Sequence, residues 1–120
     1  MNFRICTVRR FPAAHQLRLY DGSLERLHRH DWQVKVTVSG PLDAIGVVMD
    51  FHDLESRLDA VLAAWHDRTL NEVEDFRELN PSAENVAFVI ARRLRLPPGV
   101  DLRSVEVWET PGNSAVYGSD

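Results

Sequence analysis

Histidines are the residues whose spacing in this chain best suits metal chemistry. His28 and His30 are two apart at the head of a segment, 30–40, in which apolar and polar residues alternate as in a β-strand. Side chains two apart on a strand point to one face, so both imidazoles can reach the same ion. His15, which follows two small alanines, is the candidate for a third ligand. Three histidines with an open fourth position are typical of catalytic zinc; histidines exposed at a loop–strand junction are the alternative interpretation.

A carboxylate ends another alternating segment. Glu109 shares its parity with Val105 and Val107, so the pattern predicts that its side chain points to the buried face. A buried carboxylate is costly unless it has a partner. Its two oxygens can accept parallel hydrogen bonds from a planar N–H fork on a ligand. The alternative is that Glu109, as the last strand residue, already reaches solvent.

Composition limits the classes of protein to which the chain can belong. With 120 residues, 44% apolar and 27% charged residues, we expect one globular domain over residues 1–120. The net charge of −4 argues against a nucleic-acid partner, and no apolar run approaches the ~20 residues of a membrane span. Cys6 is the only cysteine, and the N-terminus lacks the layout of a signal peptide. We therefore expect a cytoplasmic protein without disulfides.

The elements that position these residues follow from periodicity. Leu54, Leu58 and Leu62 belong to a helical stripe over 50–65, with Asp50 as its N-cap, and a second helix is expected over 81–94 after an Asn80-Pro81 cap. Residues 16–27 are expected to form a loop. Four strands are expected, over 3–11, 30–40, 105–109 and 114–117. The order β-β-α-α-β-β predicts an α+β fold, with a four-stranded antiparallel sheet and two helices on one face.

Several motifs together resemble one family, that of 6-pyruvoyltetrahydropterin and 6-carboxytetrahydropterin synthases. They occur in family order at residues 11–15, 27–30, 46–51, 70–71, 80–85 and 105–110. The resemblance implies the tunnelling fold, with zinc on His15, His28 and His30. It implies a pterin substrate anchored by Glu109. It also implies homotrimers paired into homohexamers, with active sites at subunit interfaces.

Further substrate contacts are expected at two hydroxyls near these motifs. Thr110 lies beside Glu109, and Ser82 lies within the motif at 80–85.

The chain departs from the family at the catalytic base. The position of the usual cysteine is Leu24, and the adjacent Glu25 resembles a variant branch in which glutamate replaces that cysteine. That branch is associated with 6-hydroxymethyl-7,8-dihydropterin. A carboxylate beside a metal-bound hydroxyl can act as general base; a solvated loop glutamate is the alternative.

Two other departures concern the proton relay and the space between the metal ligands. The family's Asp-His pair is reversed here as His66-Asp67, so either residue remains a candidate for the base. Arg29 replaces the glycine between the two histidines and could bind a substrate phosphate or obstruct the pocket.

We therefore expect a zinc-dependent lyase acting on 7,8-dihydroneopterin triphosphate or a related pterin, with 6-hydroxymethyl-7,8-dihydropterin as a possible product. The alternatives are a 6-carboxytetrahydropterin or 6-pyruvoyltetrahydropterin synthase, or a homologue that binds zinc and pterin without this activity.

Overall fold

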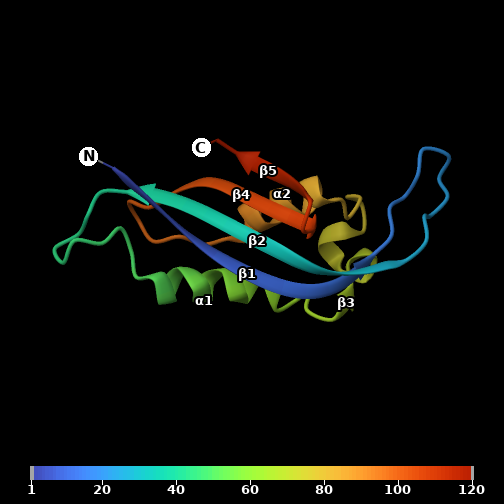
Figure 1. The fold of residues 1–120 in the computed structure, drawn as a ribbon, viewed down its shortest axis with the longest axis horizontal. Coiled ribbons are helices and arrows are strands. Elements are labelled where there is room, and N and C mark those ends of the chain that lie inside the picture. Colours follow the sequence, from blue (N-terminus) through green and yellow to red (C-terminus); the bar gives the residue numbers. More distant parts are fainter. Residues whose placement is uncertain (1, 120) are drawn as a thin grey trace.

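The computed structural model describes residues 2–119 as a twisted sheet with two α-helices against it (Figure 1). The sheet order is β3-β1-β2-β4-β5. The elements in chain order are β1 (Phe3–His15), β2 (His28–Gly40), α1 (Phe51–Leu62), β3 (Arg68–Thr69), the 3₁₀ turns η1 (Leu70–Glu72) and η2 (Glu74–Phe76), α2 (Ala83–Arg93), β4 (Asp101–Thr110) and β5 (Asn113–Gly118).

The α+β class and the placement of two helices between pairs of strands are confirmed, and the strand count needs one correction. The sheet has five strands rather than four, because the two residues of β3 pair with Ala13 and Ala14 of β1. That pairing is parallel, whereas all other neighbours are antiparallel. A strand of two residues is too short to show a periodic pattern in the sequence.

Strands β1 and β2 are longer than their patterns predict, and the extra residues matter for the site. Their antiparallel register continues from Phe11↔Trp32 to His15↔His28 without a bulge. The alanines at 13 and 14 have low strand propensity, and cross-strand pairing overrides it. His15, His28 and His30 therefore lie on regular strands and not in a loop.

Both helices are shorter than predicted, and the cap of α2 differs. Asp50 caps α1 by accepting a hydrogen bond from the backbone N–H of His52, as expected. In α2 the N-cap is Ser82, whose hydroxyl accepts from the N–H of Asn85 at 3.1 Å, and not Asn80. The Asn80 carboxamide bonds instead to the backbone of Arg18, 62 residues away.

One face of the sheet and the two helices enclose the hydrophobic core. Its largest fully buried members are Trp32, Trp65, Phe11 and Phe76. The opposite face carries exposed side chains such as Val8 and Val116. Residues 16–27 leave the body as an arm at the far end of β1 (Figure 1). Within residues 2–119, no helix has the length and apolarity needed to cross a membrane.

Candidate active site

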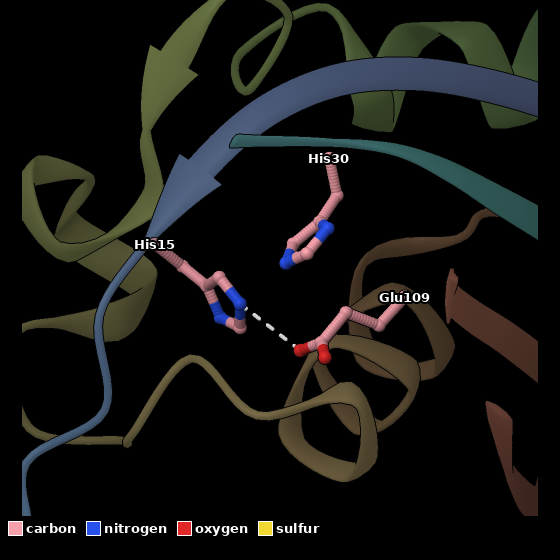
Figure 2. Close-up of side chains that lie close together, drawn as sticks. All are labelled: His15, His30 and Glu109. Carbon is pink, nitrogen blue, oxygen red and sulfur yellow. Dashed lines mark ion pairs between the residues drawn. The ribbon is translucent and has the colours of Figure 1, made fainter. Parts of the chain in front are cut away.

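Three imidazoles and a carboxylate meet where β1, β2 and β4 approach the base of the arm. The ring centroid of His15 is 5.3 Å from that of His30 and 6.2 Å from that of His28, and the His28 and His30 centroids are 5.9 Å apart. Candidate ligand atoms of His15, His30 and Glu109 all lie within 4.8 Å of one another. Figure 2 shows these three side chains pointing toward a common point.

His15 is buried, and its two ring nitrogens have different environments. Nδ1 lies 2.7 Å from the carbonyl oxygen of Pro81, which can only accept, so Nδ1 carries a proton and donates. Nε2 is buried and makes no well-aligned hydrogen bond, although it is 2.9 Å from Glu109 Oε1 (Figure 2). Two electron-rich atoms at that distance require positive charge between them, from a proton or a metal ion.

His30 and His28 complete an arrangement that suits a metal ion. Burial lowers the pKa of the His30 imidazole, which favours the neutral ring that a metal requires. Imidazoles sharing a tetrahedral zinc at ~2.0–2.1 Å from each nitrogen have ring centroids about 5 Å apart. The His15–His30 separation of 5.3 Å is close to this value, and the two separations that involve His28, 5.9 and 6.2 Å, are somewhat wider. With the orphaned Nε2 of His15, the donor set fits zinc.

Glu25 is the acidic group of the arm that faces the histidines. Its Oε1 is 3.9 Å from His28 Nε2 and accepts a hydrogen bond from the backbone N–H of Leu17 at 3.0 Å. Leu24, at the position where the family resemblance places a cysteine, is half exposed. The Glu25 carboxylate therefore lies beside the imidazole cluster, although Glu25 is one residue after the position at which the resemblance places the cysteine.

His66 and Asp67 make their contacts away from the imidazole cluster. His66 Nδ1 is 3.1 Å from Asp67 Oδ2, and both side chains are more than half exposed. Asp67 has a left-handed backbone (φ 59°), and its N–H donates to Pro12. Arg29, which alternates with the two histidines and so lies on the opposite face of the sheet, forms an ion pair with Asp67. That hydrogen bond and charge hold the pKa of the Asp67 carboxyl below its usual value.

A hollow of about 290 Å³ adjoins Glu109 on the side facing the start of α2. Residues from the arm, from the start of α2 and from the β4–β5 turn line it, among them Leu17, Ser82, Glu84, Glu109 and Asn113. Ser82 is engaged as the helix cap, and Thr110 accepts a hydrogen bond from the Asn113 side chain. The hollows of about 690 and 410 Å³ contain none of the predicted site residues, whereas a hollow of about 360 Å³ is lined by His66 together with Arg10 and Phe11.

Three polar groups that support the site could not be predicted from the sequence. The Pro81 carbonyl orients His15, and the carboxamides of Asn71 and Asn80 hold the chain on either side of Leu17. These contacts span 55 to 66 residues. Asn71 and Asn80 stand in the recognised motifs, but no local pattern connects them to residues 16–18.

This is an α+β protein with an imidazole–carboxylate cluster at one end of its sheet. A family model described as 6-pyruvoyl tetrahydropterin synthase matches residues 4–120, and the chain belongs to this family. Its fold resembles that of the 6-pyruvoyl tetrahydropterin synthase of Caenorhabditis elegans, with a TM-score of 0.88 and 26% identity, covering 100% of this chain and 97% of that one.

Curated relatives carry more than one activity in their names. The dihydroneopterin monophosphate aldolase of Pyrococcus furiosus is 36% identical over 111 residues, which are 91% of each chain. The 6-carboxy-5,6,7,8-tetrahydropterin synthase of Haemophilus influenzae is 31% identical over 139 aligned positions, covering 96% of this chain and 98% of that one. These names support pterin-metabolising lyase chemistry as the coarse assignment.

Proposed function

We propose that the protein is a zinc-dependent lyase that cleaves the side chain of a phosphorylated 7,8-dihydroneopterin, forming 6-hydroxymethyl-7,8-dihydropterin. The observation that carries this proposal is the Glu25 carboxylate beside His28, one residue after the position at which the resemblance places a cysteine. The likeness to a dihydroneopterin monophosphate aldolase supports the same reaction class.

Glu25 would act as general base and then as general acid. It removes the proton from the hydroxyl on the second side-chain carbon, and that oxygen becomes an aldehyde. The bond between the first and second side-chain carbons breaks, and its electron pair passes to the first carbon, conjugated with the pterin ring. Glu25 then returns its proton to that carbon. The products are the hydroxymethyl pterin and a two-carbon aldehyde that carries the phosphate, so atoms and electrons balance.

His15, His28 and His30 would hold the zinc. When bound, the ion acts as a Lewis acid for the hydroxyl oxygens of the side chain. The Pro81 carbonyl keeps the Nδ1 proton of His15 in place and so leaves Nε2 free as a ligand atom. Glu109, at the wall of the 290 Å³ hollow, would accept hydrogen bonds from the pterin ring.

Product analysis tests the reaction directly. The purified, zinc-loaded protein is incubated with dihydroneopterin monophosphate and with the triphosphate, and the pterin products are identified by mass. We expect 6-hydroxymethyl-7,8-dihydropterin. Formation of 6-carboxytetrahydropterin or 6-pyruvoyltetrahydropterin would contradict the proposal and favour the His66-Asp67 pair as the base. Binding without turnover would favour the degenerate homologue.

Glu109→Gln should weaken binding of the pterin more than it slows chemistry. The change replaces an acceptor with a group that is half donor, so we expect about 1–3 kcal/mol weaker binding, or roughly 5–150-fold in Kd. Fluorescence titration with the pterin and zinc analysis measure the effect. Glu106→Gln is the matched control, because Glu106 points to the opposite face of β4 and bonds Ser114. Loss of zinc in Glu109→Gln would instead identify Glu109 as a metal ligand.

Self-association is expected because the sheet has open edges. Over residues 3–11, the outer edge of β1 has no strand partner among the described residues, and β5 is the other edge of the sheet. Such edges invite pairing with another chain. The exposed His66-Asp67 pair, whose partner Arg29 lies on the opposite face of the sheet from the imidazoles, would then serve the site of a neighbouring copy.

Mixing of two inactive variants tests this arrangement. Glu25→Gln and His66→Ala chains, dissociated and reassembled together at equal amounts, should regain roughly one quarter of wild-type activity, because about one site in four then receives both intact residues. Sedimentation should show a trimer or hexamer. A monomer, or a mixture as inactive as its components although His66→Ala alone is inactive, would contradict the shared site.

A further inference from the structure

The first three residues of the arm, 16–18, are held like a strand, although they have no complete strand partner. Asn71 bonds both backbone groups of Gln16: its Oδ1 accepts from the N–H at 2.9 Å, and its Nδ2 donates to the carbonyl at 2.7 Å. Asn80 does the same for Arg18, at 2.7 Å and 3.0 Å. Each carboxamide thus replaces the peptide group of a neighbouring strand.

The residue between these two clamped positions faces Glu25. Backbone groups of successive residues in an extended chain point in opposite directions, so those of Leu17 point away from the asparagines. The Leu17 N–H donates to the Glu25 carboxylate at 3.0 Å, and the Glu25 N–H donates to the Leu17 carbonyl at 2.9 Å. Residues 16–18 therefore lie between the two asparagines and Glu25, the proposed base. The asparagines fix the position of these three residues, and Leu17 in turn fixes the position of the Glu25 carboxylate.

The segment before α2 that contains Asn80 also contacts His15, one of the proposed metal ligands. The Arg18 guanidinium donates to the carbonyls of Leu79 at 3.2 Å and Phe76 at 2.8 Å, beside the Asn80 clamp. Pro81, next in the chain, accepts from His15. One short segment before α2 thus holds both the arm and a metal ligand. Asn71, which lies in η1, is attached to the arm alone, so its substitution separates the two effects.

We propose that Asn71 and Asn80 are positioning residues that hold Glu25 against His28 by clamping Gln16 and Arg18. The inference rests on the proposed function for its catalytic consequence. Beyond the clamp, the arm is fastened mainly to itself, by bonds such as Leu19 N–H to Ser23 O at 2.7 Å. Without the clamps the carboxylate would move with the whole arm, and a displacement of about 1 Å from the productive geometry can cost ~10²-fold in rate.

Alanine variants with two independent readouts test the proposal. In Asn71→Ala and Asn80→Ala, kcat should fall by about 10–100-fold while KM stays within about threefold, because substrate contacts are unchanged and only the base is displaced. Amide hydrogen exchange in residues 16–27 should become faster, while β2 and the middle of α2 keep their protection. Zinc content should stay at the wild-type level in Asn71→Ala.

Two further variants keep the test decisive. Arg18→Gln removes the guanidinium bonds without changing η1 or α2, and should loosen the arm in the same way if an asparagine variant fails to fold. Ser23→Ala removes the 2.6 Å bond to Asp21 at the tip of the arm and should leave kcat unchanged.

The outcomes separate this inference from the proposed function. Unchanged exchange in residues 16–27 of the variants overturns the clamp. Faster exchange with full kcat, where Glu25→Gln is inactive, overturns the positioning role. If Glu25→Gln is itself fully active, the proposed base is wrong, and the exchange data alone decide whether the asparagines hold the arm.

Discussion

Glu25→Gln is expected to lower kcat by about 10²–10⁴-fold with little change in KM, because glutamine keeps the size of the side chain but cannot accept a proton. The carboxamide can still accept the Leu17 N–H bond, so the arm should keep its conformation. Steady-state assay with the phosphorylated dihydroneopterin measures both constants. Zinc analysis of the same preparation checks that the metal site is intact.

Asp21→Asn is the matched control for this variant. It removes one negative charge from the same arm, at its exposed tip, where Asp21 bonds only Ser23 among the described residues. We expect wild-type kinetics. A fully active Glu25→Gln together with an inactive Asp67→Ala would mean that the base belongs to the His66-Asp67 pair and that Glu25 has a structural role.

His28→Ala is expected to remove both the metal and the activity. A site with three histidine ligands cannot hold zinc tightly with two, so elemental analysis should fall from about one zinc per chain to a small fraction. Lewis-acid stabilisation is worth several kcal/mol, so turnover should fall by ~10³-fold or more. His52→Ala, which changes a largely exposed histidine on α1, is the control.

The His28→Ala experiment also decides between two possible sets of metal ligands. Of the described ligand atoms, those of His15, His30 and Glu109 are the closest group, whereas His28 is nearly half exposed. X-ray absorption spectroscopy distinguishes three imidazoles from two imidazoles and a carboxylate. Full zinc content in His28→Ala, with loss in Glu109→Gln, would replace His28 by Glu109 as the third ligand.

Local periodicity predicted the elements of the fold and the faces of their side chains. The period of two placed His28 and His30 on the buried face of β2 and Glu109 on that of β4, and the structure has the same faces. The stripe of apolar residues predicted α1 with its Asp50 cap. These features depend on neighbours one to four residues away, which is the range over which a sequence pattern carries information.

Contacts between residues far apart in the sequence decided the features that the local pattern could not predict. The register between β1 and β2 carried both strands to the His15↔His28 pair, and it overrode the low strand propensity of the alanines. Asn80 was expected to cap α2, but its carboxamide serves the backbone of Arg18 and leaves the cap to Ser82. No rule of spacing links residues that lie 62 positions apart.

The sequence by itself determined which residues could do chemistry and on which face of each strand they lie, because side-chain alternation is a property of the local backbone. Only the tertiary structure decided which of them meet. It brought Glu25 to His28 through the fold of the arm, and it tied Asp67 to Arg29 on the other face of the sheet. It also placed the Pro81 carbonyl on His15. Each of these meetings depends on how β1, the arm and the start of α2 pack together, and packing between distant segments leaves no periodic trace in the chain.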